Sequence, residues 1–143
     1  MADQAVALTY DVRSIGTVRS SLADPNSAPK QGDEGAPDAW IDFEPGVIDA
    51  LQGIEVGDQL VLLTWFDRAN RDVLTTHPRG DISRPEAGVF STRSPHRPNP
   101  IGLHRVEVLE LEGPRMKVSN LEALDGTPIV DVKPVLGADV SER

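Results

Sequence analysis

The sequence contains no cysteine, which excludes disulfides, thiolate metal ligands and cysteine nucleophiles. Its three histidines are widely separated, so we expect no dedicated metal site. No run approaches the roughly 18 apolar residues that a membrane-spanning helix needs, and the first residues, Met-Ala-Asp-Gln, lack the basic and apolar segments of a secretory signal. These absences predict a cytoplasmic protein without a metal and without membrane contact.

Two familiar nucleotide-binding signatures are also missing. The sequence has neither a phosphate-binding Walker loop nor the glycine fingerprint of a Rossmann fold, which disfavours the common nucleotide-binding folds. The histidines, His77, His96 and His104, have no nucleophile motif beside them, so none is predicted to act as a catalytic base. The catalytic residue is therefore left unassigned.

The pattern of apolar residues predicts a mainly β fold. A chain of 143 residues has room for one core, so we expect a single domain over residues 1–143. Twelve glycines and twelve prolines interrupt it too often for long helices. Alternating or β-branched segments predict strands at 7–19, 39–43, 59–66, 88–92, 103–111, 116–118 and 129–132. We expect a small closed β-barrel or a strongly curled sheet, with one short helix after Pro45 and long loops.

The last third of the chain supports two more detailed predictions. The buried face of the strand at 103–111 changes near Val108 and Leu109, as a β-bulge requires. Asp125-Gly126 predicts a hairpin turn into the closing strand, on which Asp131 and Lys133 share a face and can pair.

Charge is distributed unevenly along the chain. The protein has 14 basic and 23 acidic side chains, and its net charge of −9 does not favour a polyanionic partner. Between His77 and Arg105, however, five arginines stand against two acids, a local charge of +3 in an acidic body. This basic stretch can bind a carboxylate, a phosphate or an acidic surface of the protein itself, and the count does not choose among them.

The basic stretch includes the most unusual segment, which runs from Gly88 to Leu103 with the sequence GVFSTRSPHRPNPIGL. Three prolines fix φ and remove backbone donors, so the shape of this loop is largely predetermined. Arg93 and Arg97 offer guanidinium groups that suit a carboxylate or phosphate, and Asn99 adds an amide. Two alternatives remain: a rigid surface loop with ordinary salt bridges, and a proline-rich ligand for an SH3-like module.

Together with the segment from Asp125 to Pro134, DGTPIVDVKP, this loop resembles the TsaA-like (TrmO) family of S-adenosylmethionine-dependent tRNA methyltransferases. The family pattern runs G-V-F-A-T-R-S-P-x-R-P-N-P-I-G-L and then D-G-T-P-x-x-D-I-K-P. Shorter matches at Pro29-Lys30-Gln31 and at Thr64-Trp65-Phe66 fall in the same order. The resemblance therefore covers nearly the whole chain.

The resemblance implies a small β-barrel methyltransferase that acts as a homodimer, with S-adenosylmethionine bound near the subunit interface. The implied reaction is N-methylation of threonylcarbamoyl-adenosine next to the anticodon of tRNA. At the motif positions of Arg97 and Asn99, the resemblance implies residues that hold the loop or meet the substrate. The implied cofactor-binding residues are Pro29, Lys30, Gln31, Asp67, Arg68, Arg93, Leu103, Leu121, Glu122, Ala123, Leu124 and Asp125.

The chemistry of the cofactor agrees with these residue types. Arginine suits its carboxylate, Glu122 or Asp125 suits the ribose diol or the ammonium group, and leucines can form an apolar wall. Methyl transfer is an in-line displacement that alignment and desolvation accelerate. Two alternatives remain open, and the acidic charge, Lys30 in place of the usual arginine and Asp67 in place of histidine favour the first of them. One is an enzyme of this fold that modifies a small metabolite, and the other is a non-catalytic cofactor-binding module.

Overall fold

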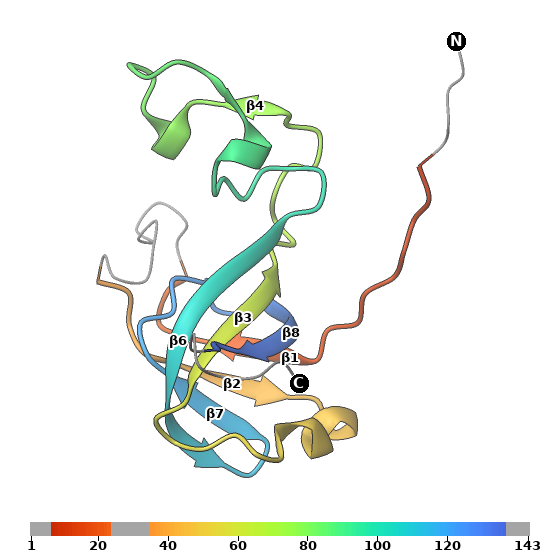
Figure 1. Ribbon diagram of the computed structural model, residues 1–143, viewed down its shortest axis with the longest axis vertical. Helices are drawn as coiled ribbons and strands as arrows, with labels where there is room; N and C mark the ends of the chain where they lie inside the picture. Colours follow the sequence, from red (N-terminus) through yellow and green to blue (C-terminus); the bar gives the residue numbers. More distant parts are fainter. Residues whose placement is uncertain (1–6, 24–34, 137–143) are drawn as a thin grey trace.

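The computed structural model describes residues 7–23 and 35–136, and six of its strands close into one antiparallel ring (Figure 1). The strand order is β1-β2-β7-β6-β3-β8, and β8 returns to pair with β1. The ring is not evenly barrel-shaped, because its strands differ widely in length. The prediction of a mainly β fold is confirmed. The six strands are β1 (Gly16–Arg19), β2 (Ala39–Phe43), β3 (Gln59–Trp65), β6 (Ile101–Glu112), β7 (Arg115–Val118) and β8 (Pro128–Pro134).

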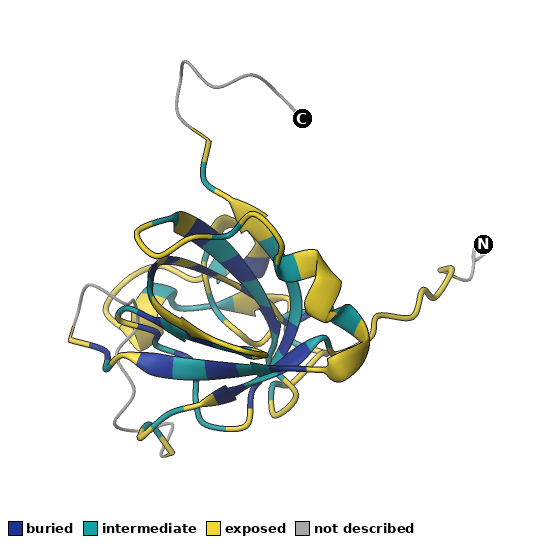
Figure 2. Ribbon diagram, turned by 90° about the horizontal axis from the view of Figure 1, so that it is seen from below, coloured by how far each residue is buried: buried dark blue, intermediate teal, exposed yellow. Residues whose placement is uncertain are grey.

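Alternating burial along the strands places the core inside the ring. Leu60 and Leu62 of β3 point inward, as do Val106 and Val108 of β6, whereas their sequence neighbours lie on the outer face. Figure 2 shows buried and partly exposed residues alternating around the ring. The other buried core residues include Val18, Ala39, Ile41, Phe43, Met116, Val118, Leu121, Ala123 and Ile129.

Three of the local predictions agree with the structure. The predicted helix is η3 (Pro45–Leu51), a short 3-10 helix that begins at the proline. The strand register shifts between Val108 and Glu110, which confirms the bulge. Lys133 Nζ lies 3.3 Å from an oxygen of Asp131, so the predicted ion pair on β8 is confirmed.

Residues 66–100 leave the ring between β3 and β6 and form a projecting segment, which we call the arm (Figure 1). It contains β4 (Thr75–Thr76), η4 (Pro78–Gly80), β5 (Ala87–Gly88) and η5 (Val89–Ser91), with β4 paired to β5. The predicted strand at 88–92 is therefore wrong. Strand pairing ends at Gly88, and a single 3-10 turn follows, closed by a hydrogen bond from Thr92 N to Val89 O at 3.0 Å.

Two further predictions need correction. Of the opening strand predicted at 7–19, only Gly16–Arg19 forms a strand, because residues 7–14 lie exposed and pair with no strand in the part of the chain that the structure describes. Gly126 adopts a φ of +88° and the chain turns there, but the turn is not part of a hairpin, since β8 pairs with β1 and β3 rather than with β7. In the described ranges, no helix is long and apolar enough to cross a membrane.

Candidate functional site

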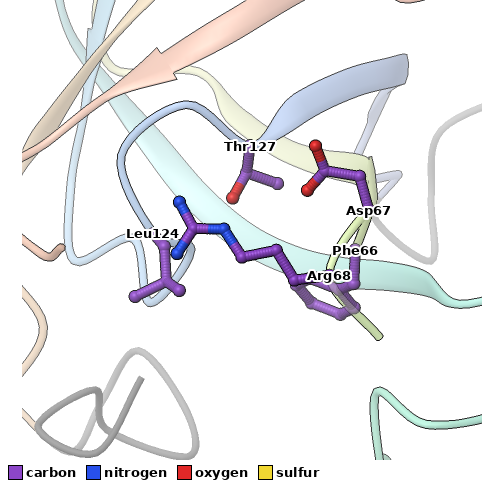
Figure 3. A pocket seen from close by; sticks show the side chains of 5 residues that line it. All are labelled: Phe66, Asp67, Arg68, Leu124 and Thr127. Carbon is purple, nitrogen blue, oxygen red and sulfur yellow. The ribbon is translucent and has the colours of Figure 1, made fainter. Parts of the chain in front are cut away.

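A small pocket lies where the arm leaves β3, opposite the loop that precedes β8. It has a volume of about 50 Å³ and is lined by Phe66, Asp67, Arg68, Leu124 and Thr127. Figure 3 shows the Arg68 side chain extending toward Leu124 and the Asp67 carboxylate beside Thr127. The fold thus brings the adjacent residues Asp67 and Arg68 together with Leu124 from a distant part of the chain, and all three are predicted cofactor-binding residues.

The turn beside this pocket is anchored to the end of β1. Gly126 N donates to Val18 O at 2.8 Å, and Asp125 N donates to Leu22 O at 2.6 Å. The carboxylate of Asp125 accepts a hydrogen bond from Ser20 N at 3.0 Å. One carboxylate oxygen of Asp125 therefore stabilises the turn, and these bonds fix the position of the pocket residues Leu124 and Thr127 on either side of it.

A buried polar network, which sequence reasoning missed, lies behind the pocket. His104 Nε2 is 2.7 Å from Thr64 Oγ1, and His104 Nδ1 is 2.5 Å from Glu122 Oε1. The rings of His104 and of Phe66, a pocket residue, pack edge to face with their centroids 5.9 Å apart. The sequence held a signal for this network, because alternation along β6 places His104 on the inward face, where an imidazole needs partners.

The proline-rich loop is held by side chains as well as by its prolines. Arg97 donates hydrogen bonds to the carbonyl oxygens of Val89 and Thr92. Asn99 accepts a hydrogen bond from Arg71 Nη2 at 3.0 Å. Of the two roles predicted for Arg97 and Asn99, these contacts support holding the loop.

Arg71 is a second residue that sequence reasoning missed. Its Nε donates to Pro98 O at 2.6 Å, and its guanidinium lies 5.1 Å from the ring centroid of Trp65 at the end of β3. Arg71 therefore ties the proline-rich loop to the ring. No motif marked it, since the polar segment around it gave no indication of its partners.

Arg93 and Leu103 lie outside the pocket in a single chain. Arg93 is exposed and has no hydrogen bond or ion pair within the described part of the protein. Leu103 is 47% exposed on the outer face of β6 and pairs with Leu63 on β3. It belongs to a row of apolar side chains that we call the outer stripe, formed by Val61, Leu63, Trp65, Ile101 and Leu103.

The other predicted cofactor-binding residues fall into two groups. Leu121 and Ala123 are 0% and 1% exposed and pack in the core, so neither is open to a ligand in the described structure. Pro29, Lys30 and Gln31 lie outside the described residues.

One carboxylate away from the pocket is paired with two arginines. Asp42 on β2 accepts hydrogen bonds from Arg19 Nε at 3.1 Å and from Arg115 Nε at 3.0 Å. Burial on its own raises the pKa of the Asp42 carboxyl, but the bonds and charges of both arginines outweigh it and hold that pKa below its ordinary value. Across residues 7–23 and 35–136, no group of three or more histidine, aspartate or glutamate side chains could hold a metal ion.

Comparison with known protein families gives one match over most of the chain. Residues 17–139 match the tRNA-methyltransferase O N-terminal domain.

Individual relatives of known sequence carry names that refer to S-adenosyl-L-methionine. An Archaeoglobus fulgidus protein named "S-adenosyl-L-methionine-binding protein" is 44% identical over 122 residues, which cover 85% of this chain and 86% of that protein. A second A. fulgidus protein, named "Probable S-adenosyl-L-methionine-binding protein", is 50% identical over 127 residues. That match covers 89% of this chain, which spans only 34% of the length of that relative.

Among solved structures, the crystal structure of TrmO from Pseudomonas aeruginosa superposes with a TM-score of 0.73 at 30% sequence identity. The superposition covers 94% of this chain and 61% of that chain.

Proposed function

The chain belongs to the tRNA-methyltransferase O N-terminal domain family, and on this premise we propose that it binds S-adenosylmethionine at the pocket between the arm and the turn before β8. The observation that carries the proposal is the meeting of Asp67, Arg68 and Leu124 around one pocket. Each of them stands at a motif position that the resemblance assigns to the cofactor, and no short-range pattern in the sequence requires Leu124 to meet the adjacent Asp67 and Arg68.

The residues present suit parts of this cofactor. Arg68 offers a guanidinium fork to a carboxylate, Asp67 accepts hydrogen bonds from hydroxyl or ammonium groups, and Phe66 and Leu124 exclude water from one side. When bound, the cofactor supplies a methyl group for in-line transfer to a nucleophile. A pocket of about 50 Å³ is small beside the roughly 300–1,000 Å³ of typical ligand sites. We therefore infer that one chain supplies only part of the site.

We propose that a homodimer completes the site. The outer stripe presents Ile101 and Leu103, which are 42% and 47% exposed, and an apolar row of this kind is stabilised by a partner surface. Arg93 is exposed and unpaired within the described chain, so it is available to a ligand held by the partner subunit. A dimer would allow Arg93 of one chain to reach the pocket of the other, since Arg93 does not line the pocket of its own chain.

Mixing two inactive variants tests the shared site. Arg68→Ala and Arg93→Ala are each expected to lose methyl transfer. After dissociation and reassembly at equal concentration, about half of the dimers contain one chain of each variant. In such a mixed dimer one of the two sites has both arginines, so roughly a quarter of all sites would be restored. Recovery of that order supports a site built from two chains. Absent recovery, with mixed dimers verified by mass spectrometry, would place both arginines at one chain's site and contradict the proposal.

We infer that the acceptor is tRNA, methylated on the exocyclic nitrogen of threonylcarbamoyl-adenosine next to the anticodon. The family and the basic stretch between His77 and Arg105 support this acceptor. The net charge of −9, and the use of Arg97 within its own loop, favour the second candidate, an enzyme of this fold that modifies a small metabolite.

One labelling experiment separates these readings. The protein is incubated with methyl-labelled cofactor and cell extract, and the RNA and small-molecule pools are counted separately. Label in the tRNA fraction, with retention of tRNA on a filter that falls steeply with salt, supports the tRNA substrate, because phosphate contacts release counterions. Label in the small-molecule pool supports the second candidate. Cofactor binding without transfer to either pool would indicate a binding module and contradict the proposed enzyme.

A further inference from the structure

The proposed function leaves one buried titratable side chain without a role, that of His104. It is 3% exposed and projects from β6 into the ring. Both ring nitrogens have partners, since Nε2 lies 2.7 Å from Thr64 Oγ1 and Nδ1 lies 2.5 Å from Glu122 Oε1. An imidazole held at both nitrogens is fixed in orientation, so His104 presents a rigid hydrogen-bonding partner to Glu122.

Glu122 connects this network to the edge of the pocket. Along residues 121–124 burial alternates: Leu121 and Ala123 are buried in the core, whereas Glu122 and Leu124 are partly exposed. Leu124 lines the pocket. The side chain of Glu122 is 16% exposed, with Oε1 held by His104. Within the described chain, Oε2 has no hydrogen-bonding partner.

The opposite wall of the pocket also touches the imidazole. Phe66 lines the pocket, and its ring lies edge-on to His104 at a centroid distance of 5.9 Å. Phe66 directly follows β3, and Glu122 lies in the loop before β8, two residues before the lining residue Leu124. His104 therefore contacts one pocket residue, Phe66, and a carboxylate next to the opposite wall. Without the ring nitrogens of His104, the carboxylate of Glu122 would lose this hydrogen bond and would turn toward water to regain one.

We propose that His104 is a positioning residue that holds the carboxylate of Glu122 at the edge of the cofactor pocket, with Oε2 turned to a donor group of the cofactor. A carboxylate accepts hydrogen bonds from the ribose hydroxyls and from the amino group, so both are suitable donors. Thr64 completes the arrangement, since its hydroxyl can donate to Nε2 while the proton on Nδ1 is donated to Glu122. This role rests on the proposed cofactor site.

A double-mutant cycle on cofactor affinity tests the role. His104→Phe and Glu122→Gln are each expected to weaken S-adenosylmethionine binding by about tenfold, as the loss of one charge-assisted hydrogen bond predicts. If His104 acts through Glu122, His104→Phe has little further effect in the Glu122→Gln protein. Thr64→Ser is expected to retain affinity and Thr64→Val to lose it.

Nitrogen NMR of the wild-type protein gives a second readout that a purely structural role would not move. Cofactor addition is expected to shift the ring-nitrogen resonances of His104, identified by their absence from His104→Phe, and to leave them unchanged in Glu122→Gln. Additive losses in the cycle, or unshifted His104 resonances in a wild-type protein that binds the cofactor, would overturn the role of His104 alone. Failure of the wild-type protein to bind would overturn the proposed function and this role with it.

Discussion

Replacement of Gly102 by alanine is expected to disturb the fold and the pocket together. Gly102 lies directly across from Thr64 in the pairing of β6 with β3. An added Cβ would stand 2.4 Å from Thr64 Oγ1 and 2.4 Å from Cζ of Phe66, more than 1 Å inside the roughly 3.5–4.0 Å of ordinary carbon contacts. Phe66 and the Thr64 hydroxyl must both move to accommodate the methyl group.

Overpacking of this kind lowers the free energy of unfolding by about 1–3 kcal/mol. In a chain of this size, that loss lowers Tm by several degrees. Because Phe66 is a pocket wall and Thr64 contacts His104, we also expect weaker cofactor binding, by about tenfold for each 1.4 kcal/mol lost at the site.

Urea unfolding followed by tryptophan fluorescence measures the first effect, and titration calorimetry with S-adenosylmethionine measures the second. Gly46→Ala in η3 is the matched control, because no atom lies within 4 Å of its added Cβ, and it is expected to be neutral or stabilising by up to about 1 kcal/mol. A Gly102→Ala protein as stable as Gly46→Ala would refute the packing argument.

Three further predictions concern other parts of the molecule. Arg97→Ala removes charged hydrogen bonds to two backbone carbonyls and should cost about 2–3 kcal/mol in urea unfolding, whereas Arg93→Ala should change stability by less than about 0.5 kcal/mol. Asp42→Asn should cost at most about 1 kcal/mol at pH 7, since its ion pairs are exposed. The pKa of Asp42 is lowered on folding, so the contribution of its carboxylate to stability is present above the ordinary value of 3.8 and is lost as the pH falls below it. The Tm values of the wild-type and Asp42→Asn proteins should therefore converge at low pH. A Tm difference that stays constant with pH would contradict this linkage. Leu103→Glu should convert a dimer to a monomer in sedimentation velocity, and an unchanged sedimentation coefficient would rule out the outer stripe as the contact.

The sequence was sufficient to predict the parts of the fold that local patterns determine. Alternation at Ala39, Ile41 and Phe43 predicted a strand with one buried face, and the change of face near Val108 predicted the bulge. By contrast, the pattern at 7–14 predicted a strand, but none forms there, because no strand among residues 7–23 and 35–136 pairs with this segment. Strand partners depend on the whole ring, which is why the turn at Gly126 was predicted but its return to β1 was not.

The residues of the candidate site could be predicted only in part, and only from the family resemblance. The resemblance identified Asp67, Arg68 and Leu124, which the fold places around one pocket. Alternation along β6 indicates that His104 points inward, but residue types and spacing could not identify its partners, which come from β3 and from the loop between β7 and β8. The same holds for Arg71, which reaches the proline-rich loop only through the folding of the arm.

Calorimetric titration of the wild-type protein with S-adenosylmethionine tests the central claim most directly. Arg68→Ala is the pocket variant, and Arg84→Ala is its control, because Arg84 is an exposed arginine of the arm whose ion pair with Asp81 is 3.6 Å long. We predict binding by the wild-type and Arg84→Ala proteins and an affinity about tenfold lower or worse for Arg68→Ala. Absence of binding by the wild-type protein at millimolar cofactor, or equal affinity in all three proteins, would contradict the claim.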